Sequence, residues 1–354
     1  DPINFPGRHW KKTSNNKIQC NVCPRKCQLK DGQRGFCFVR KNEGDQMVLT
    51  TYGRSSGFCI DPIEKKPLNH FLPGTPVLSF GTAGCNLGCK FCQNWDISKA
   101  KEMDTLQAVA SPNQIADLAA GLNCKSIAFT YNDPVIFMEY AIDIAIACKE
   151  KNIQSVAVSA GYMQSASRNE FYSVIDAANI DLKAFTDTFY KKRCMAQLAP
   201  VLDTLLYLKY ETNVWFEITT LIIPEENDSI DELNELSQWI YTNLGPDIPL
   251  HFSAFHPDFK MMDKPHTPSE TLTLARNIAI DNGLHYVYTG NVHDTTGGST
   301  YCPTCNERLI ERDWYNLGEF NIENGNCKFC NTKINGQFTQ TPGTWGRNRQ
   351  PVFI

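Results

Sequence analysis

The most informative stretch of this chain is Gly84-Cys85-Asn86-Leu87-Gly88-Cys89-Lys90-Phe91-Cys92-Gln93. Its cysteines have the spacing C-x3-C-x2-C, and the aromatic Phe91 precedes the last of them. Three thiolates in one short loop can hold three irons of a cubane cluster and leave the fourth iron open. The spacing therefore predicts a cluster that binds a substrate or cofactor. Three packed apolar cysteines are the plain alternative, but thiols rarely gather at ligand spacing without a metal.

The rest of the 354-residue chain has an ordinary globular composition, with 34 Lys and Arg against 38 Asp and Glu and 42% hydrophobic residues. The absence of a basic block argues against nucleic acid as a partner. No apolar run reaches the roughly 20 residues that span a bilayer, and residues 1–12 lack the apolar core of a signal peptide. We therefore expect a cytoplasmic protein that binds neither nucleic acid nor membrane.

Cysteine is the unusual component, with 15 residues. Eleven of them form three groups: Cys20, Cys23, Cys27 and Cys37; Cys85, Cys89 and Cys92; and Cys302, Cys305, Cys327 and Cys330. Clustered thiols in this composition predict metal sites in a reducing compartment rather than disulfides. The four isolated cysteines, Cys59, Cys124, Cys148 and Cys194, are expected to pack as small apolar residues.

The two groups of four differ in regularity. Cys302-x2-Cys305 and Cys327-x2-Cys330 are two CxxC pairs with 21 residues between them. This spacing is typical of a four-thiolate site of the zinc-ribbon type, so structural zinc is expected, with rubredoxin-like iron or an auxiliary cluster as the alternative. The N-terminal group is less regular. A closed zinc site is expected there too, with an auxiliary iron–sulfur cluster as the alternative.

The region from about residue 76 alternates short apolar runs with amphipathic segments. Strands are predicted at 76–81, 126–130, 153–159, 179–182, 213–223, 249–254 and 285–289. Intervening helical patterns, with starts marked by Ser111-Pro112 and by a capping box of Thr267 with Glu270, predict a parallel α/β architecture. Because seven strands are too few for a closed eight-stranded barrel, we expect a partial (β/α) TIM-like barrel.

The cysteine groups divide the chain into four expected parts. Residues 1–75 form a four-cysteine metal-binding lead-in, 76–299 the partial barrel, 300–340 a zinc-ribbon-like unit, and 341–354 an extended or partly disordered tail. Small metal-binding units are thus expected at both ends of the barrel.

Polar residues follow the predicted strands at the ends where parallel α/β barrels collect their reactive groups. They include Asn132, Asp133, Ser159, Gly161, Asp181, Lys183, Glu217 and His251, with His256 just beyond its strand. Because they would meet on the rim that carries the cysteine loop, we interpret this rim as a ligand-lined barrel mouth.

Several segments also carry a family resemblance over nearly the whole chain. They are Cys20-Asn-Val-Cys23-Pro-Arg-Lys-Cys27, Asp61-Pro-Ile-Glu-Lys-Lys-Pro67, Cys89-Lys-Phe-Cys92-Gln-Asn-Trp95, Asp181-Leu-Lys183, His251-Phe-Ser-Ala-Phe-His256-Pro257, Tyr286-Val-Tyr-Thr-Gly-Asn291 and Tyr301-Cys-Pro-Thr-Cys305. On these segments the chain resembles the radical SAM enzymes of the AmmeMemoRadiSam system, which are related to pyruvate formate-lyase activating enzymes.

The resemblance implies a [4Fe-4S] cluster on Cys85, Cys89 and Cys92, with S-adenosylmethionine (SAM) on the open iron. It implies an oxidoreductase in which one electron, from a flavodoxin or ferredoxin, cleaves SAM to methionine and a 5′-deoxyadenosyl radical. That radical would abstract hydrogen from a substrate that the sequence does not identify.

The residues expected to bind cofactor are Phe91, Asn94, Asn132, Asp133, Ser159, Gly161, Asp181, Lys183, Glu217 and His251. Asp133 suits the SAM ammonium and Lys183 its carboxylate, and a monovalent cation is implied near Asp181. Two positions depart from the family pattern: Asp133 stands where glutamate is usual, and Ala160 where asparagine is common.

Alternatives remain at the level of the substrate and of the class of protein. The enzyme would be an activase that makes a glycyl radical on a partner protein, or it would modify a small molecule or another protein site, with Memo-like and Ammecr-type proteins as partners. A zinc-bearing nucleic-acid adaptor is disfavoured by the near-neutral charge. A plain electron carrier would need a fully ligated cluster, which three cysteines do not supply.

Overall fold

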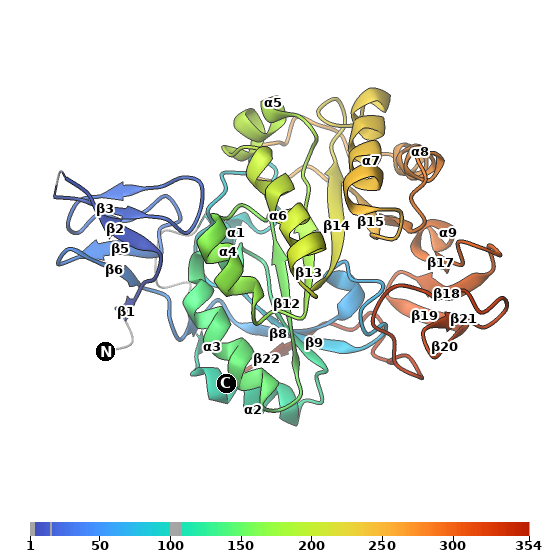
Figure 1. The fold of residues 1–354 in the computed structure, drawn as a ribbon, viewed down its shortest axis with the longest axis horizontal. Coiled ribbons are helices and arrows are strands. Elements are labelled where there is room, and N and C mark those ends of the chain that lie inside the picture. The colour runs from blue at the N-terminus through green and yellow to red at the C-terminus, as the bar shows by residue number, and fades with distance from the viewer. Residues whose placement is uncertain (1–3, 15, 100–105, 107, 354) are drawn as a thin grey trace.

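The structure is a computed structural model that describes residues 4–14, 16–99, 106 and 108–353. A nine-stranded sheet forms its centre, and a small β-rich unit lies at each end (Figure 1). The strand order is β16-β15-β14-β13-β12-β11-β9-β8-β22.

The seven predicted strands are confirmed. They are β9 (Pro76–Phe80), β11 (Ser126–Phe129), β12 (Gln154–Ser159), β13 (Ala177–Asp181), β14 (Trp215–Ile222), β15 (Leu250–Ala254) and β16 (Val287–Gly290). All six pairings between them are parallel. The register sets Asp181 beside Thr219 and Thr219 beside His251, so the ends of β13, β14 and β15 share one rim.

Two further strands extend the sheet with antiparallel pairing. β8 (Phe58–Pro62) pairs with β9, and β22 (Gln350–Val352) pairs with β8. The central sheet therefore includes one strand from residues 1–75 and one from the tail. Within the described residues β16 pairs with β15 alone, so the sheet stays open, as a partial barrel requires.

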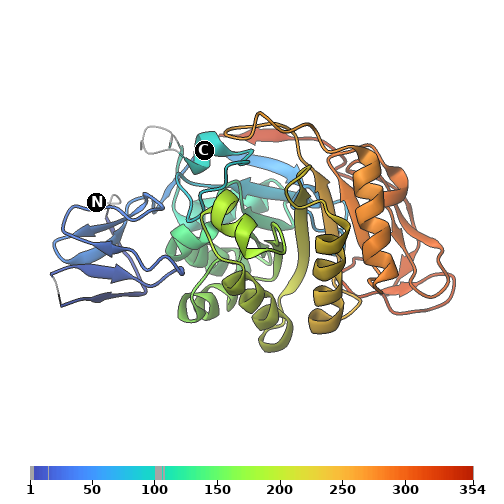
Figure 2. The same cartoon turned by 90° about the horizontal axis from the view of Figure 1, so that it is seen from above.

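Helices connect the parallel strands and cover the outer face of the curved sheet (Figure 2). The longer ones are α2 (Pro112–Gly121), α3 (Met138–Lys149), α4 (Ser165–Tyr172), α6 (Ala199–Glu211), α7 (Ile230–Leu244) and α8 (Ser269–Asp281). Short helical turns are α1 (Trp95–Ser98), α5 (Asp187–Phe189) and α9 (Thr295–Gly298).

One predicted helix start is confirmed and one is wrong. Ser111 caps α2 in a complete capping box, with Pro112 as the first helical residue. Helix α8 instead begins at Ser269, with Pro268 in the cap position. The hydroxyl of Thr267 accepts from the Phe255 amide and donates to the Ile222 carbonyl, so it joins two strand ends rather than capping α8.

The N-terminal unit consists of two small antiparallel sheets. One contains β2 (Trp10–Lys12), β3 (Ile18–Cys20) and β4 (Gln28–Leu29), and the other β1 (Phe5–Pro6), β6 (Gln46–Leu49) and β5 (Arg40–Glu43). β7 (Arg54–Ser55) pairs with β10 (Ala108–Val109). The buried Arg40 guanidinium binds both carboxylate oxygens of Glu139 in α3, which fixes this unit to the barrel.

The C-terminal unit lies at the opposite end of the sheet (Figures 1 and 2). Its strands are β17 (Thr300–Tyr301), β18 (Arg308–Asp313), β19 (Asn316–Phe320), β20 (Ile322–Glu323) and β21 (Asn326–Cys327). Arg312, which is 2% exposed, donates to the Asn69 carbonyl and so ties β18 to the barrel. No helix among the described residues has the length and apolar character needed to cross a bilayer.

Candidate active site

The cysteine loop follows β9 and is held in place by its neighbours. The Asn132 side chain donates to the Gly84 carbonyl at 2.8 Å and accepts from the Thr82 amide at 3.1 Å. Gly84 has φ +82°, and a Cβ there would lie 2.0 Å from the Cys37 carbonyl oxygen, so only glycine fits. The Gly88 amide donates to the Cys194 carbonyl at 2.8 Å. Asn132 therefore positions this loop.

Cys85, Cys89 and Cys92 line one cavity of about 440 Å³, called the central cavity below. Within the described residues these sulfurs do not gather within 4.8 Å of one another, which leaves room between them for a multinuclear cluster. Burial raises the pKa of Cys85 to about 12 and that of Cys92 above its ordinary value. A metal that binds these sulfurs displaces the thiol protons. The donor set therefore fits the predicted cluster.

Most of the predicted cofactor residues also line the central cavity. These are Phe91, Asn94, Asn132, Asp133, Asp181, Lys183 and His251. Ser159, Gly161 and Glu217 are not part of its lining. Gly161 has φ +64° and packs toward Ile180 and Thr204.

Lys183 places a fixed positive charge beside the cysteines. Its ammonium lies 3.0 Å from an Asp181 oxygen and 5.8 Å from the centre of the Phe91 ring. Burial alone would lower its pKa, but Asp181 and the Cys89 sulfur raise it well above the ordinary value. Lys183 is therefore charged at any physiological pH. The monovalent cation near Asp181 stays a prediction, and it would have to share this carboxylate with Lys183.

The Asp133 carboxylate is occupied chiefly by hydrogen bonds from neighbouring residues of the protein. Its carboxylate accepts from the Ala160 amide at 2.9 Å, the Ser159 hydroxyl at 3.0 Å and the Val135 amide at 3.1 Å. A carboxylate has about four acceptor positions, so little capacity is left for a ligand ammonium. Asp133 thus joins the ends of β11 and β12, and Ser159 serves that same junction.

Glu217 lies beneath the cavity and orients His251. It is fully buried and accepts from the Asn69 and His70 amides, while one of its oxygens lies 2.6 Å from His251 Nε2. These partners hold its pKa below the ordinary value despite burial. The His251 ring stacks on Tyr288 at 5.0 Å between centroids, so its position in the cavity wall is fixed from two sides.

Two other histidines, His70 and His256, lie in different surroundings. His70 is fully buried between the Asn335 carbonyl and the Tyr288 hydroxyl, and burial lowers its pKa to about 4. His256 is exposed, does not line the central cavity, and hydrogen-bonds Gln93.

Sequence reasoning missed a buried ion-pair cluster in the cavity wall. Asp61 is fully buried, and its carboxylate binds Lys66 at 2.6 Å, Lys65 at 3.1 Å and the Tyr131 hydroxyl at 2.8 Å. Lys65, Lys66 and Tyr131 line the central cavity. Burial lowers the pKa of Lys66 to about 8 against the opposing effect of Asp61. Apart from the resemblance of the 61–67 segment, no periodicity or spacing marked these residues.

The C-terminal unit also contributes to the cavity wall. Arg312, Trp314 and Tyr315 line the central cavity although they follow the last parallel strand. The turn between β18 and β19 carries Trp314 and Tyr315 there. Their residue types carried no signal of this role, because it depends on how the unit docks against the barrel.

Cys194 is isolated in the sequence and is predicted to pack as a small apolar residue, but it also lies against the cysteine loop. It is fully buried at the end of a short π-helical turn, and it lowers the pKa of Cys89 to about 7 by a side-chain hydrogen bond. A fourth thiol thus stands next to one of the three loop cysteines. Its distance along the chain from the loop hid it from spacing arguments.

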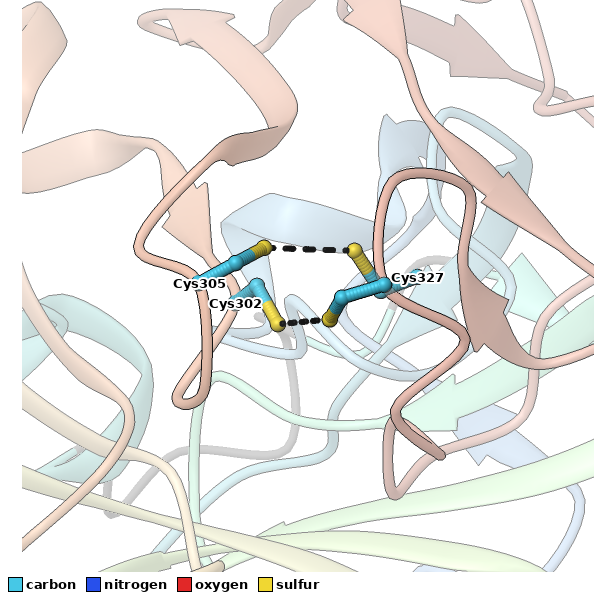
Figure 3. Close-up of side chains that lie close together, drawn as sticks. Cys302, Cys305 and Cys327 are labelled. Atoms are coloured by element: carbon cyan, nitrogen blue, oxygen red, sulfur yellow. Dashed lines mark hydrogen bonds between the residues drawn. The ribbon is translucent and has the colours of Figure 1, made fainter.

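The two groups of four cysteines differ in how closely their sulfurs approach. Cys302 lies 3.5 Å from Cys330 and Cys305 lies 3.7 Å from Cys327, measured between sulfurs. Figure 3 shows how Cys302, Cys305 and Cys327 converge. This group could hold a metal ion. Cys20, Cys23, Cys27 and Cys37 line a second cavity.

Comparisons with known proteins agree with this geometry. The family model described as the Radical SAM superfamily matches residues 80–237. The uncharacterized protein MJ0808 of Methanocaldococcus jannaschii is 42% identical over 327 residues, which are 92% of this chain and 97% of that protein. The pyruvate formate-lyase-activating enzyme of Clostridium pasteurianum is 25% identical over 48% of this chain and 70% of that enzyme.

Among solved structures, a domain of a pyruvate-formate lyase-activating enzyme from Bacteroides vulgatus aligns with a TM-score of 0.41 and 17% identity, over 46% of this chain and 98% of that domain. The sequence matches and the spacing of the cysteine loop indicate the same superfamily. The chain belongs to the radical SAM superfamily of enzymes, whose members use a [4Fe-4S] cluster and S-adenosylmethionine, and it is similar over part of its length to a pyruvate formate-lyase-activating enzyme.

Proposed function

We propose that this protein is an oxidoreductase that cleaves SAM reductively at a [4Fe-4S] cluster held by Cys85, Cys89 and Cys92. The observation that carries the proposal is that these cysteines and the charged pair Asp181–Lys183 line one cavity. When bound, the reduced cluster supplies the electron that splits SAM into methionine and the 5′-deoxyadenosyl radical that takes hydrogen from the substrate.

The chain's own residues would bind and orient SAM. Lys183 offers a permanent cation for the SAM carboxylate, and the Asn94 amide, at the start of α1, lines the same cavity. His251, fixed by Glu217, presents a polar ring edge in the wall. Because the three acceptor bonds of Asp133 are internal, its main effect on SAM would be to hold the backbone at Ala160 in place.

Of the two substrate classes, we favour a small molecule. Arg312 and Trp314 of the C-terminal unit form part of the cavity wall, so this unit borders the space that a substrate must enter. A glycyl loop of a partner protein would have to pass the same unit. The similarity to a pyruvate formate-lyase-activating enzyme favours the second candidate, an activase for a partner protein.

The sequence resemblance supports a proposal for the cellular setting of the enzyme. We propose that it acts in the AmmeMemoRadiSam system, in the cytoplasm, with a flavodoxin or ferredoxin as reductant and Memo-like and Ammecr-type proteins as partners. Copurification of such a partner with the tagged full chain, or its failure, tests this placement.

Structural zinc at Cys302, Cys305, Cys327 and Cys330 is a further part of the proposal. Four sulfurs at about 2.3 Å from one zinc ion lie about 3.8 Å apart in a tetrahedron. The two sulfur–sulfur distances of 3.5 and 3.7 Å match that separation. The ion would close a unit too small to bury a large core.

The test of the proposed function is SAM cleavage by the anaerobically reconstituted protein. With dithionite, the wild type is expected to convert SAM to 5′-deoxyadenosine and methionine, and a Cys89→Ala variant to form neither. Deuterated candidate metabolites then separate the two substrate classes: deuterium in 5′-deoxyadenosine marks a small-molecule substrate, whereas a glycyl-radical signal on an added protein marks an activase.

A further inference from the structure

The N-terminal cysteines surround a cavity next to the cysteine loop. Cys20, Cys23, Cys27 and Cys37 line it together with Arg25, Arg40 and Asn86. The Arg25 guanidinium donates to the carbonyls of Asn86 and Met195, and Gly84 packs against the Cys37 carbonyl. Asn86 thus borders this cavity, while its neighbour Cys85 lines the central one. Adjacent residues of the cysteine loop therefore line the two cavities.

The spacing of these sulfurs differs from that of a zinc site. Four thiolates on one zinc ion lie about 3.8 Å apart, as the C-terminal group nearly does. Within the described chain, no three of the N-terminal sulfurs come within 4.8 Å of one another. The same is true of Cys85, Cys89 and Cys92. Wider spacing is expected when each thiolate binds a different iron of a cluster.

A buried arginine supplies a second, independent observation. Arg40 is 2% exposed and lines the cavity, and its charge acts on both Cys20 and Cys37. Its Nε atom has no nitrogen or oxygen partner among the described residues, and its guanidinium lies within hydrogen-bonding reach of the Cys20 sulfur. A cluster carries negative charge and sulfur acceptors, which an arginine N–H in this cavity would meet.

The remaining lining fits a cluster as well. Val22, Val135 and Ile136 give the cavity apolar walls, and Cys20, Cys23 and Cys37 are buried. Such walls limit the access of water and oxygen to a bound cluster. Sequence spacing alone favours zinc at this site, with an auxiliary cluster as the alternative. The sulfur separation, Arg40 and the apolar walls favour the cluster instead.

We propose that Cys20, Cys23, Cys27 and Cys37 hold a second [4Fe-4S] cluster, ligated at all four irons, beside the SAM-cleaving cluster. Full ligation leaves no open iron for SAM. The site is independent of the proposed reaction, because its ligands lie on a different unit and share no residue with the cysteine loop.

The test is a full-length variant that lacks the first cluster, with Cys85, Cys89 and Cys92 all changed to Ala. After anaerobic reconstitution we expect it to retain about four iron and four sulfide per chain, with one cluster signal in Mössbauer spectra. Zinc in place of iron, or no metal at the N-terminal group, overturns the proposal. Additional Cys20→Ser and Cys37→Ser changes should abolish the remaining iron.

Metal analysis of the wild type decides the matter if the triple variant does not fold. Two clusters predict about eight iron and eight sulfide per chain with one zinc, whereas a zinc-bearing N-terminal group predicts about four iron and two zinc. Loss of SAM cleavage with eight iron present would refute the proposed function and leave the second cluster standing. SAM cleavage by a protein that holds only four iron per chain would refute the second cluster and leave the proposed function standing.

Discussion

The C-terminal cysteine group and the cysteine loop use the same side chain in opposite arrangements. In the C-terminal group two pairs of sulfurs lie 3.5 and 3.7 Å apart, away from the central cavity. In the loop, three sulfurs are more widely spaced and line that cavity with Lys183. A closed set of four satisfies one ion and stabilises a fold, whereas an open set of three leaves a site for chemistry. The arrangement of the sulfurs, more than their number, separates structure from reactivity.

The largest expected effect comes from breaking the closed set with Cys305→Ser. Structural zinc contributes on the order of 10 kcal/mol to such units. We expect the zinc content to fall by about one per chain and amide exchange to accelerate across residues 300–338, while the iron content stays unchanged. Cys124→Ser, at a buried isolated cysteine, is the control. Unchanged zinc content in Cys305→Ser would refute the closed site.

A second prediction concerns the Asp61–Lys66 pair in the cavity wall. Asp61→Asn leaves the Lys66 ammonium, which is 2% exposed, without its carboxylate. We expect a loss of about 3–5 kcal/mol in the free energy of unfolding at pH 7, measured by urea denaturation. Replacing both residues, with Asn and Met, should recover most of the loss. A cost below 1 kcal/mol for the single variant would contradict a buried pair.

The same variant has a pH dependence of known sign. Burial places the folded pKa of Lys66 at about 8, below the value of about 10.4 expected for the unfolded chain. Between these values the unfolded state binds more protons, so this group makes stability rise with pH. Without Asp61 the folded pKa falls further, and the cost of Asp61→Asn should therefore be smaller at pH 9 than at pH 7. An equal or larger cost at pH 9 would count against this account.

A smaller effect is expected at the rim, from Asp133→Asn. The amide oxygen cannot accept from all three donors that the carboxylate now serves, so the end of β12 should loosen. We expect the KM for SAM to rise about tenfold, as for the loss of one hydrogen bond of about 1.4 kcal/mol, with the iron content unchanged. Asp117→Asn, at an exposed position, is the control. An unchanged KM would remove Asp133 from the SAM site.

The smallest expected effect sharpens the distinction between open and closed sets. Cys194→Ala removes the hydrogen bond to Cys89. If three cysteines hold the cluster, iron and sulfide contents stay constant, and the rate of SAM cleavage falls by roughly two- to tenfold, the equivalent of one hydrogen bond. Loss of the cluster in this variant would mean that Cys194 is a fourth ligand and that the set is closed.

The sequence predicts the parts of this molecule that depend on local pattern. The seven parallel strands follow from apolar runs and are confirmed. The spacing of the cysteine loop predicts the superfamily that the family model matches, while the ligand role of its cysteines stays a prediction. The capping-box spacing of Thr267 predicts the wrong start for α8, because the Thr267 hydroxyl hydrogen-bonds the backbone at the ends of two other strands. Tertiary hydrogen bonds of this kind override a local capping signal.

The missed parts of the site depend on contacts between distant segments. Lys66, Cys194 and Trp314 reach the cysteine loop or its cavity from three separate parts of the chain. Nothing in their local sequence encodes the docking that brings them there. Asp133 was placed correctly at a strand end, but its three internal hydrogen bonds could be seen only in the folded chain.

The most direct test of the central claim is the amount of 5′-deoxyadenosine formed from SAM by the reconstituted, dithionite-reduced wild type. The Cys89→Ala variant serves as its reference. The account predicts that the wild type forms 5′-deoxyadenosine when the cluster is present and that Cys89→Ala forms none. Cys305→Ser should still form it, when the amount is expressed per mole of folded barrel. No product from a wild type that holds its full iron and sulfide, or equal product from Cys89→Ala, would contradict the claim that the open three-cysteine set performs the chemistry.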